Sequence, residues 1–417
     1  MSKHISNHKS ISSTEQDAAG APAATPSGRA TAAESLPELL MAELMQGWCP
    51  SNTTPQSIQK PLINHPNYLF CGGLDYFAWS ALVEWDNDCF KNLFDQLKSF
   101  KEYCQEFSKP SERVYLAGSI PAFVHRTGAN RGGERGVHFP YCITHAGLRI
   151  ALGDWQPTQR TQDNLFIEMK GKDCLNHGAW ETHQHITEIV NKLGGKILDE
   201  KLSRADFCLD IANLPVSELQ ELIQARNFIT KFKVVSPYEN LVNELLTGFS
   251  AGNSPKRLIA YDKLEQTKNK CDQEYVQALI QRRYGGIVPE HATRIEIQLG
   301  RESLIKSGIS RPRDVLVHGP FALRQLMTET FRLTDIPIPV GTKNHSRAEI
   351  HPLWESIING FETVFGSPGE KPVPIDRSKL IQNNSLSNPW VACEMHFYRK
   401  VNLYFHSKSF FFWSSMK

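Results

Sequence analysis

The chain of 417 residues lacks the features of a secreted, membrane-spanning or disulfide-stabilised protein. Its nine cysteines include no C-x-x-C pair, which argues against a zinc site or a disulfide framework and favours a reducing compartment. No basic segment followed by an apolar stretch opens the chain, and no apolar run reaches the roughly 20 residues of a membrane helix. We therefore expect a cytoplasmic protein with no membrane partner.

The chain also has little net charge and no repeat at a fixed period. The formal charge of +2 provides no global argument for a nucleic-acid partner, so any such argument must come from local patterns. With 40% hydrophobic and 22% charged residues, the composition is that of a soluble globular protein. The length leaves room for one large domain or two ordinary ones.

Three regions follow from composition along the chain. Residues 1–40 are rich in Ser, Ala, Thr and Gly and cannot bury enough apolar surface to order themselves, so we expect a disordered arm. Residues 65–335 alternate strand and helix patterns and form the predicted main domain. Residues 336–417 are expected to be a helical extension followed by an irregular tail.

The order of these patterns predicts an α+β fold with a largely antiparallel central sheet and helices packed on one face. Strands are expected within residues 68–83, 137–152, 165–170 and 292–299, and a hairpin within 244–265. Helices are expected at residues 88–107, 181–193, 216–226, 273–284, 314–331 and 352–365.

The most informative stretch is SRADFCLDI, residues 203–211. In a strand, Asp206, Cys208 and Asp210 share one face, while the apolar residues between them face the core. The two carboxylates would lie about 13–14 Å apart, too far to share one ion unless the strand twists or bulges. Either one of them joins groups from neighbouring strands, or both are solvated.

Two later strands carry polar stripes of the same kind. One stripe contains Arg257, Tyr261 and Lys263, and the other contains Arg294 and Glu296. If these strands neighbour residues 203–211, then carboxylates, a phenol and cations converge on one sheet face. Such a set suits phosphodiester chemistry, in which carboxylates hold Mg²⁺ or Mn²⁺ and a tyrosine hydroxyl attacks phosphorus. From spacing alone this is one interpretation among several.

The order of these motifs resembles a known family. R-x-D-x-x-x-D at Arg204–Asp210 is followed by T-G-F-S-A-G-N-S and R-L-I-A-Y-D-K-x-E at residues 247–265, and then by R-I-E-I-Q-L at residues 294–299. This succession is similar to the rolling-circle replication initiators of small plasmids, a family that includes phage initiators and relaxases of conjugative elements. The resemblance covers residues 68–331, and more loosely includes G-L-D-Y at residues 73–76.

The resemblance implies a nicking enzyme that binds an origin duplex, cleaves one strand and stays attached to its 5′ phosphate through tyrosine. The nucleophile would be Tyr261, assisted by Lys263, which could hold phosphate or lower the pKa of the phenol. A divalent metal, Mg²⁺ or Mn²⁺, would be held by Asp206 and Glu296, with Asp210 as a further ligand. Contacts to DNA would come from the three arginines of the motifs: Arg204, Arg257 and Arg294. Expected partners are duplex and single-stranded DNA, a host helicase and a second copy of the chain.

Three other functions remain open at the level of sequence. A conjugative relaxase would use the same chemistry, a non-catalytic relative would bind DNA only, and an unrelated metal nuclease would use water and leave Tyr261 structural. Residues 126–135 (RTGANRGGER) are either a phosphate-contacting loop or a plain solvated loop. His183 and His185 could suggest a metal motif, but in a helix residues two apart point in different directions.

Overall fold

The computed structural model describes residues 68–131, 136–240, 245–268, 272–339 and 347–372. The predicted arm at residues 1–40 and the tail after residue 372 lie outside these ranges, so both stay predictions. None of the helices in the described ranges is long and apolar enough to cross a membrane.

The described residues form a mixed α+β fold, as predicted. The strands are β1 (Leu69–Trp85), β2 (Ser111–Leu116), β3 (Ile120–His125), β4 (Ala129–Arg131), β5 (Val137–Phe139), β6 (Tyr141–His145), β7 (Leu148–Leu152), β8 (Leu165–Lys170), β9 (Gly195–Ala212), β10 (Phe228–Thr230), β11 (Val235–Asn240), β12 (Leu245–Asn253), β13 (Lys256–Asp262), β14 (Ala292–Gly300) and β15 (Phe331–Leu333). The helices are α2 (Asn87–Glu106), α3 (Gly171–His177), α4 (Ala179–Lys192), α5 (Val216–Gln224), α6 (Lys263–Lys268), α7 (Gln273–Tyr284), α8 (Arg301–Lys306), α9 (Asp314–Gln325), the π-helical turn η3 (Leu326–Thr330) and α10 (Pro352–Phe365).

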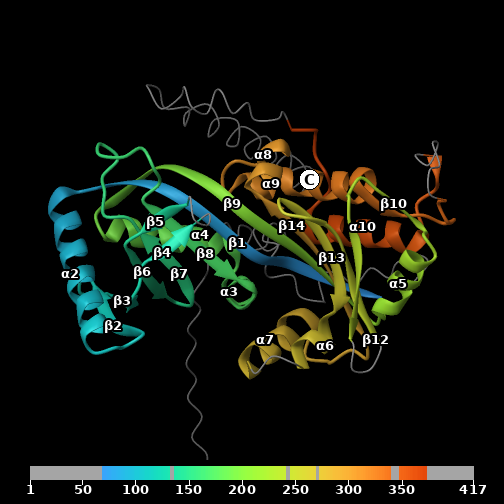
Figure 1. Ribbon diagram of the computed structural model, residues 1–417, viewed down its shortest axis with the longest axis horizontal. Coiled ribbons are helices and arrows are strands. Elements are labelled where there is room, and N and C mark those ends of the chain that lie inside the picture. Colours follow the sequence, from blue (N-terminus) through green and yellow to red (C-terminus); the bar gives the residue numbers. More distant parts are fainter. Residues whose placement is uncertain (1–67, 132–135, 241–244, 269–271, 340–346, 373–417) are drawn as a thin grey trace, which may run out of the picture. The chain divides into compact units, whose positions relative to one another are not determined.

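One antiparallel sheet of eleven strands dominates the structure, in the order β11-β12-β13-β14-β9-β1-β8-β7-β6-β3-β2 (Figure 1). The long strands β1 and β9 pair along almost their whole length in its centre. The hairpin β12–β13, the strand β14 and the helices α7 and α10 occupy the residues predicted for them. The stretch 137–152 instead forms the strands β5, β6 and β7, because Ala146 and Gly147 take positive φ and turn the chain back.

Helices cover both faces of the central strands, so the expectation that they pack on one face was wrong. On one face, Phe207 of β9 contacts Gly319 of α9 and the ring of Phe365 of α10. The opposite face meets α6 and α7, which Figure 1 shows on the other side of the sheet from α9 and α10. Alternation had assigned Cys208 and Asp210 to the polar face of their strand, and in the structure that face is covered. Cys208 and Asp210 are fully buried there.

Candidate active site on the central sheet

Three neighbouring strands bring the predicted polar stripes together. The register places Tyr261 of β13 opposite Arg294 of β14, and Arg294 opposite Asp210 of β9. Two residues along, Ile259, Glu296 and Cys208 form the next row, and Arg257, Gln298 and Asp206 form the row after that. Since directly paired residues share a face, the convergence that the sequence suggested is present.

A cavity of about 770 Å³ opens over these rows. The side chains that border it include Tyr261, Glu296, Asp206, Arg204 and Arg257 of the predicted set. Three predicted residues do not border it, namely Lys263, Asp210 and Arg294. The predicted set therefore divides into residues that face the cavity and residues that lie beneath or beside it.

Tyr261 and Glu296 form the central pair of the cavity. The Tyr261 hydroxyl donates a hydrogen bond to Glu296 Oε2 over 3.3 Å. Burial and the negative charges of Glu296, Asp75 and Asp210 raise the pKa of the phenol well above its usual value, against the opposing charge of Arg294. Burial and the charge of Asp75 also raise the pKa of Glu296. A carboxylate of raised pKa hydrogen-bonded to a phenol can accept the proton that the phenol must lose to attack phosphorus.

Asp206 is buried at the cavity wall and paired with an arginine from its own strand. Arg204 donates from Nε to Asp206 Oδ1 over 2.8 Å and from Nη2 to Oδ2 over 2.6 Å. Burial raises the pKa of Asp206 to about 7, because the charges of Glu296 and Asp75 add to the effect of burial and Arg204 offsets only part of it. The Arg204 side chain is 43% exposed and its guanidinium lies over the ring of Tyr76, so it can reach a ligand in the cavity.

Asp75 is a cavity residue that the sequence pattern did not assign to the site. It lies where the register between β1 and β9 shifts: Leu74 pairs with Phe207 on the core face, and Tyr76 pairs with Asp206 on the cavity face. Asp75 is thus the extra residue of a β-bulge, and such bulges often redirect a side chain beside a functional site. The sequence signal that could have pointed to Asp75 was the G-L-D-Y stretch, which the family resemblance includes. Strict alternation cannot locate a residue at a bulge.

Arg294 and Asp210 form a buried ion pair below the cavity. Arg294 is 1% exposed; its Nη2 donates to Asp210 Oδ2 over 2.7 Å, and its Nε donates to Asp210 Oδ1. Its Nη1 donates to Asp75 Oδ1 over 2.6 Å. With both its oxygens held by Arg294 and no exposed surface, Asp210 is placed as a counter-ion and not at a metal. Arg294, predicted to contact DNA, has no surface from which to do so.

Lys263 lies beside Tyr261 but not on its strand. The residue begins α6, where the sequence pattern had placed it two positions along the strand of Tyr261. Its Nζ lies 5.7 Å from the centre of the Tyr261 ring and 5.3 Å from that of Tyr275, and it donates to Gln266 Oε1 over 2.7 Å. The side chain is 1% exposed, so its contact is with the ring faces and not with a ligand in the cavity. The cation that opposes the rise in the pKa of the Tyr261 phenol is Arg294.

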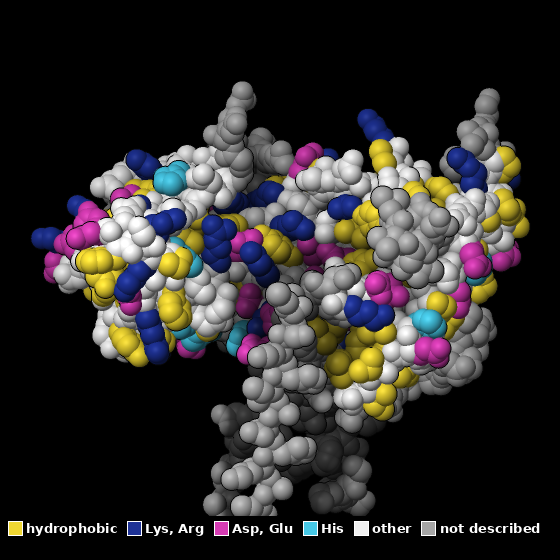
Figure 2. All heavy atoms as spheres, turned by 60° about the horizontal axis from the view of Figure 1, so that its bottom comes forward, with side chains coloured by type: hydrophobic (Ala, Val, Ile, Leu, Met, Phe, Trp, Pro, Cys, Tyr) yellow, Lys and Arg dark blue, Asp and Glu magenta, His cyan; other side chains and the backbone are white. Residues whose placement is uncertain are grey.

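Arg257 and Lys170 supply positive charge at the cavity border. Arg257 Nη2 donates to the hydroxyl of Tyr238, while its Nε is buried and has no hydrogen-bond partner among the described residues. Lys170, at the end of β8, is exposed and forms no ion pair with any described residue. Figure 2 shows Lys and Arg side chains mixed with Asp and Glu near the middle of the face in view. Positive charge at the site is therefore local, in keeping with the small net charge.

The carboxylates of Asp75, Asp206 and Glu296 fit a hard divalent cation by their chemistry. They are oxygen donors of the kind that Mg²⁺ and Mn²⁺ prefer, and their mutual repulsion is what a cation would relieve. In the structure, however, these carboxylates are not arranged around a common metal position. Within the described ranges no group of three or more His, Cys, Asp and Glu side chains is arranged to hold a metal, and Arg204 occupies both oxygens of Asp206.

The histidines of α4 bind different partners, in agreement with their helical spacing. His183 Nε2 lies 2.8 Å from Glu200 Oε1, and His185 Nε2 lies 2.9 Å from His145 Nε2. The stretch 126–135 contains β4, and its Gly-rich part at residues 132–135 lies outside the described residues. Its phosphate-contacting role stays a prediction.

Comparison with known proteins finds similarity among solved structures. No family model matches the chain, and no curated protein matches it. Among solved structures, a similar chain is the rolling circle replication initiator protein from Geobacillus stearothermophilus, with 14% identity and a TM-score of 0.41. The alignment covers 73% of this chain and 100% of that chain. At these values the similarity does not assign an activity, and the side chains of the cavity must carry the functional conclusion.

Proposed function

We propose that this chain is a DNA strand-transfer enzyme of the rolling-circle type, which nicks one strand through Tyr261 and later rejoins it. The observation that carries the proposal is the Tyr261–Glu296 hydrogen bond at the wall of an open cavity that is also bordered by Asp75, Asp206, Arg204 and Arg257. A nucleophile, a proton acceptor and cations for phosphate thus meet in one place. The succession of motifs along the chain supports the same reaction.

In the proposed nicking step, the Tyr261 oxygen attacks the scissile phosphorus while its proton passes to Glu296. The bond between phosphorus and the 3′ oxygen breaks, which leaves a 5′-phosphotyrosine and a 3′ hydroxyl. The departing 3′ oxygen takes up a proton from the water of the open cavity, while Asp206 stays ionised beside Arg204. Arg204 and Arg257 are positioned at the cavity to bind the non-bridging phosphate oxygens. Reversal of these steps rejoins the strand.

A divalent cation at Asp75, Asp206 and Glu296 would add polarisation of a phosphate oxygen. We propose Mg²⁺ or Mn²⁺ for this role, in place of the set that included Asp210. Because Arg204 holds Asp206 in the structure, this guanidinium would transfer from the carboxylate to phosphate when the ion and the strand bind. Manganese binding can be followed by electron paramagnetic resonance without DNA. We expect Asp75→Asn to weaken it and Asp210→Asn, on a residue outside the cavity, to leave it unchanged if the variant folds.

Covalent trapping tests the nicking proposal. Incubation with Mn²⁺ and end-labelled single-stranded DNA carrying a randomised segment should give a protein–DNA adduct that survives denaturation. Tyr261→Phe should abolish the adduct. Tyr238→Phe is the matched control, since Tyr238 borders the same cavity, and should retain it. An equal adduct from Tyr261→Phe, or none from the wild type on any substrate, would contradict the proposal.

The same chemistry would serve a replication initiator or a conjugative relaxase, and we propose the initiator, with an origin duplex and its single strand as DNA partners. A host helicase and a second copy of the chain are proposed as further partners. A non-catalytic DNA-binding relative would bind DNA without forming the adduct. If the protein were a nuclease that uses water, the Tyr261→Phe variant would cleave DNA as well as the wild type does.

A further inference from the structure

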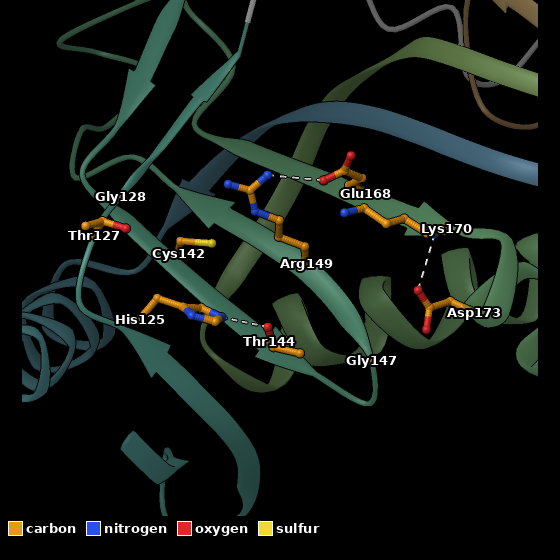
Figure 3. Close-up of a pocket in the computed structure, with 10 residues that line it drawn as sticks. All are labelled: His125, Thr127, Gly128, Cys142, Thr144, Gly147, Arg149, Glu168, Lys170 and Asp173. Atoms are coloured by element: carbon orange, nitrogen blue, oxygen red, sulfur yellow. Dashed lines mark hydrogen bonds and ion pairs between the residues drawn. The ribbon is translucent and has the colours of Figure 1, made fainter. Parts of the chain in front are cut away.

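A second cavity, of about 260 Å³, lies beside the candidate active site on the same sheet. Figure 3 shows its walls, which come from the end of β3 and the loop after it, from β6, β7 and β8, and from Asp173 of α3. Lys170 borders both cavities. Nothing in the proposed nicking reaction uses the other residues of this second cavity.

Pairing across the strands joins the two cavities. Tyr76 of β1 is paired with Asp206 on one side and with Lys170 on the other, so the three share one face. The hydroxyl of Tyr76 donates to Glu168 Oε1 over 2.6 Å, and Glu168 lines the second cavity. Arg204, which holds Asp206, lies 4.6 Å from the centre of the Tyr76 ring. Side chains in direct contact therefore run from the second cavity to Asp206.

The second cavity presents donors and acceptors together. Arg149 Nη1 donates to Glu168 Oε2 over 3.3 Å (Figure 3), and the Arg149 side chain is 46% exposed, which leaves donors available. The hydroxyls of Thr127 and Thr144 add groups that can donate or accept. A bare phosphate offers only acceptors and would be repelled by Glu168. The edge of a nucleobase carries both kinds of group and matches this wall.

We propose that this cavity is a nucleotide subsite that takes one base of the single strand next to the reacting phosphate. The expected base is guanine, because an arginine pairs with its O6 and N7 acceptors while a carboxylate accepts from its N–H groups. The phosphate of that nucleotide lies at Lys170, between the two cavities. This inference rests on the proposed function, which it deepens by assigning a base preference beside the nick.

Binding measured without cleavage tests the subsite. In a Tyr261→Phe background, fluorescein-labelled oligo-dT with one central dG, dA or dC is titrated at several salt concentrations. The dG oligonucleotide should bind most tightly. Arg149→Met should weaken its binding roughly tenfold and remove the preference. Lys170→Met should weaken all oligonucleotides alike and lower the salt slope by about one, as loss of a phosphate contact does.

Two further variants protect this test against effects of folding and charge. Arg149→Lys keeps the charge but loses the planar fork, so it should also lose the dG preference while remaining folded. Arg160→Met removes an exposed arginine that stacks on Trp155 outside both cavities and should bind as the parent does. The subsite is refuted if Arg149→Met and Arg149→Lys both keep the dG preference, or if the parent shows none.

The two proposals fail in different ways. If the wild type forms no covalent adduct but the dG preference depends on Arg149, the nicking proposal fails and the subsite stands as a single-strand site. If the adduct forms through Tyr261 and the Arg149 variants bind every oligonucleotide as Arg160→Met does, the subsite fails and the nicking proposal stands.

Discussion

At the scale of single residues, the candidate site is a set of carboxylates kept apart from water. Asp206 is 2% exposed and Glu296 is 7% exposed, and burial contributes most to the rise in the pKa of each. Arg204 compensates Asp206 only in part. A ligand that brings positive charge into this cavity would therefore relieve a cost already present in the fold.

The raised pKa of Asp206 predicts how stability depends on pH. Because the folded-state pKa of about 7 exceeds the ordinary value of 3.8, the folded state binds more protons than the unfolded state between these pH values. This group therefore makes the free energy of unfolding fall as pH rises from about 4 to about 7. Asp206→Asn should lessen that fall, by at most about 1.4 kcal/mol per pH unit.

Urea unfolding at four pH values between 4.5 and 7.5 measures this effect. Asp95→Asn, on an exposed position of α2, serves as the control and should keep the pH slope of the wild type. An unchanged slope in Asp206→Asn would show that Asp206 ionises in the folded state as it does in the unfolded chain.

At the scale of elements, one arginine links three strands below the cavity through ion pairs. Arg294 extends from β14, holds Asp210 on β9 and reaches Asp75 in the bulge of β1. Its position fixes both the floor of the cavity and the orientation of Asp75. Tyr261, directly opposite Arg294 on β13, is placed by the same register.

Removal of this arginine should be costly. Arg294→Met leaves Asp210 fully buried without its cation, and we expect a loss of about 3–5 kcal/mol in the free energy of unfolding. Adding Asp210→Leu removes the uncompensated charge and should recover most of that loss. Chemical denaturation of the single and double variants measures the coupling. Losses that simply add would mean that the two side chains do not interact in the folded protein.

At the scale of the whole molecule, the site lies on the central strands of the sheet. The strands that carry Asp206, Glu296 and Asp75 are the central ones, with paired neighbours on both sides and helices over both faces. Among the described residues, β11 and β2 have a strand neighbour on one side only. A rigid support is what a site with several converging groups requires.

Hydrogen exchange followed by mass spectrometry should reveal this gradient. Amides of β9 and β14 are expected to exchange about two orders of magnitude more slowly than those of β2 and β11, because their opening requires disruption of the core. Peptides from α9, on the other side of the sheet, provide a reference within the same sample. Equal protection of β2 and β9 would contradict the placement of the site strands at the centre.

The sequence alone determined the main elements and the strands of the site. Alternation in residues 203–211 and 292–299 separated the core residues from the polar ones, because successive side chains of a strand point to opposite faces. The hairpin carrying Tyr261 was predictable from its turn residues. Five residues of the predicted set border one cavity in the structure, namely Tyr261, Glu296, Asp206, Arg204 and Arg257.

Only the tertiary structure decided which polar residues meet the cavity and which are buried as partners of one another. Asp206 and Asp210 are equivalent in the sequence pattern, yet one borders the cavity and the other is the counter-ion of Arg294. Asp75 enters the site through a bulge, and Lys263 leaves the strand for α6. The physical reason is that burial and ion pairing depend on strands distant in sequence and on the helices that cover the sheet. The periodicity of residues within one strand contains no information about either of these contacts.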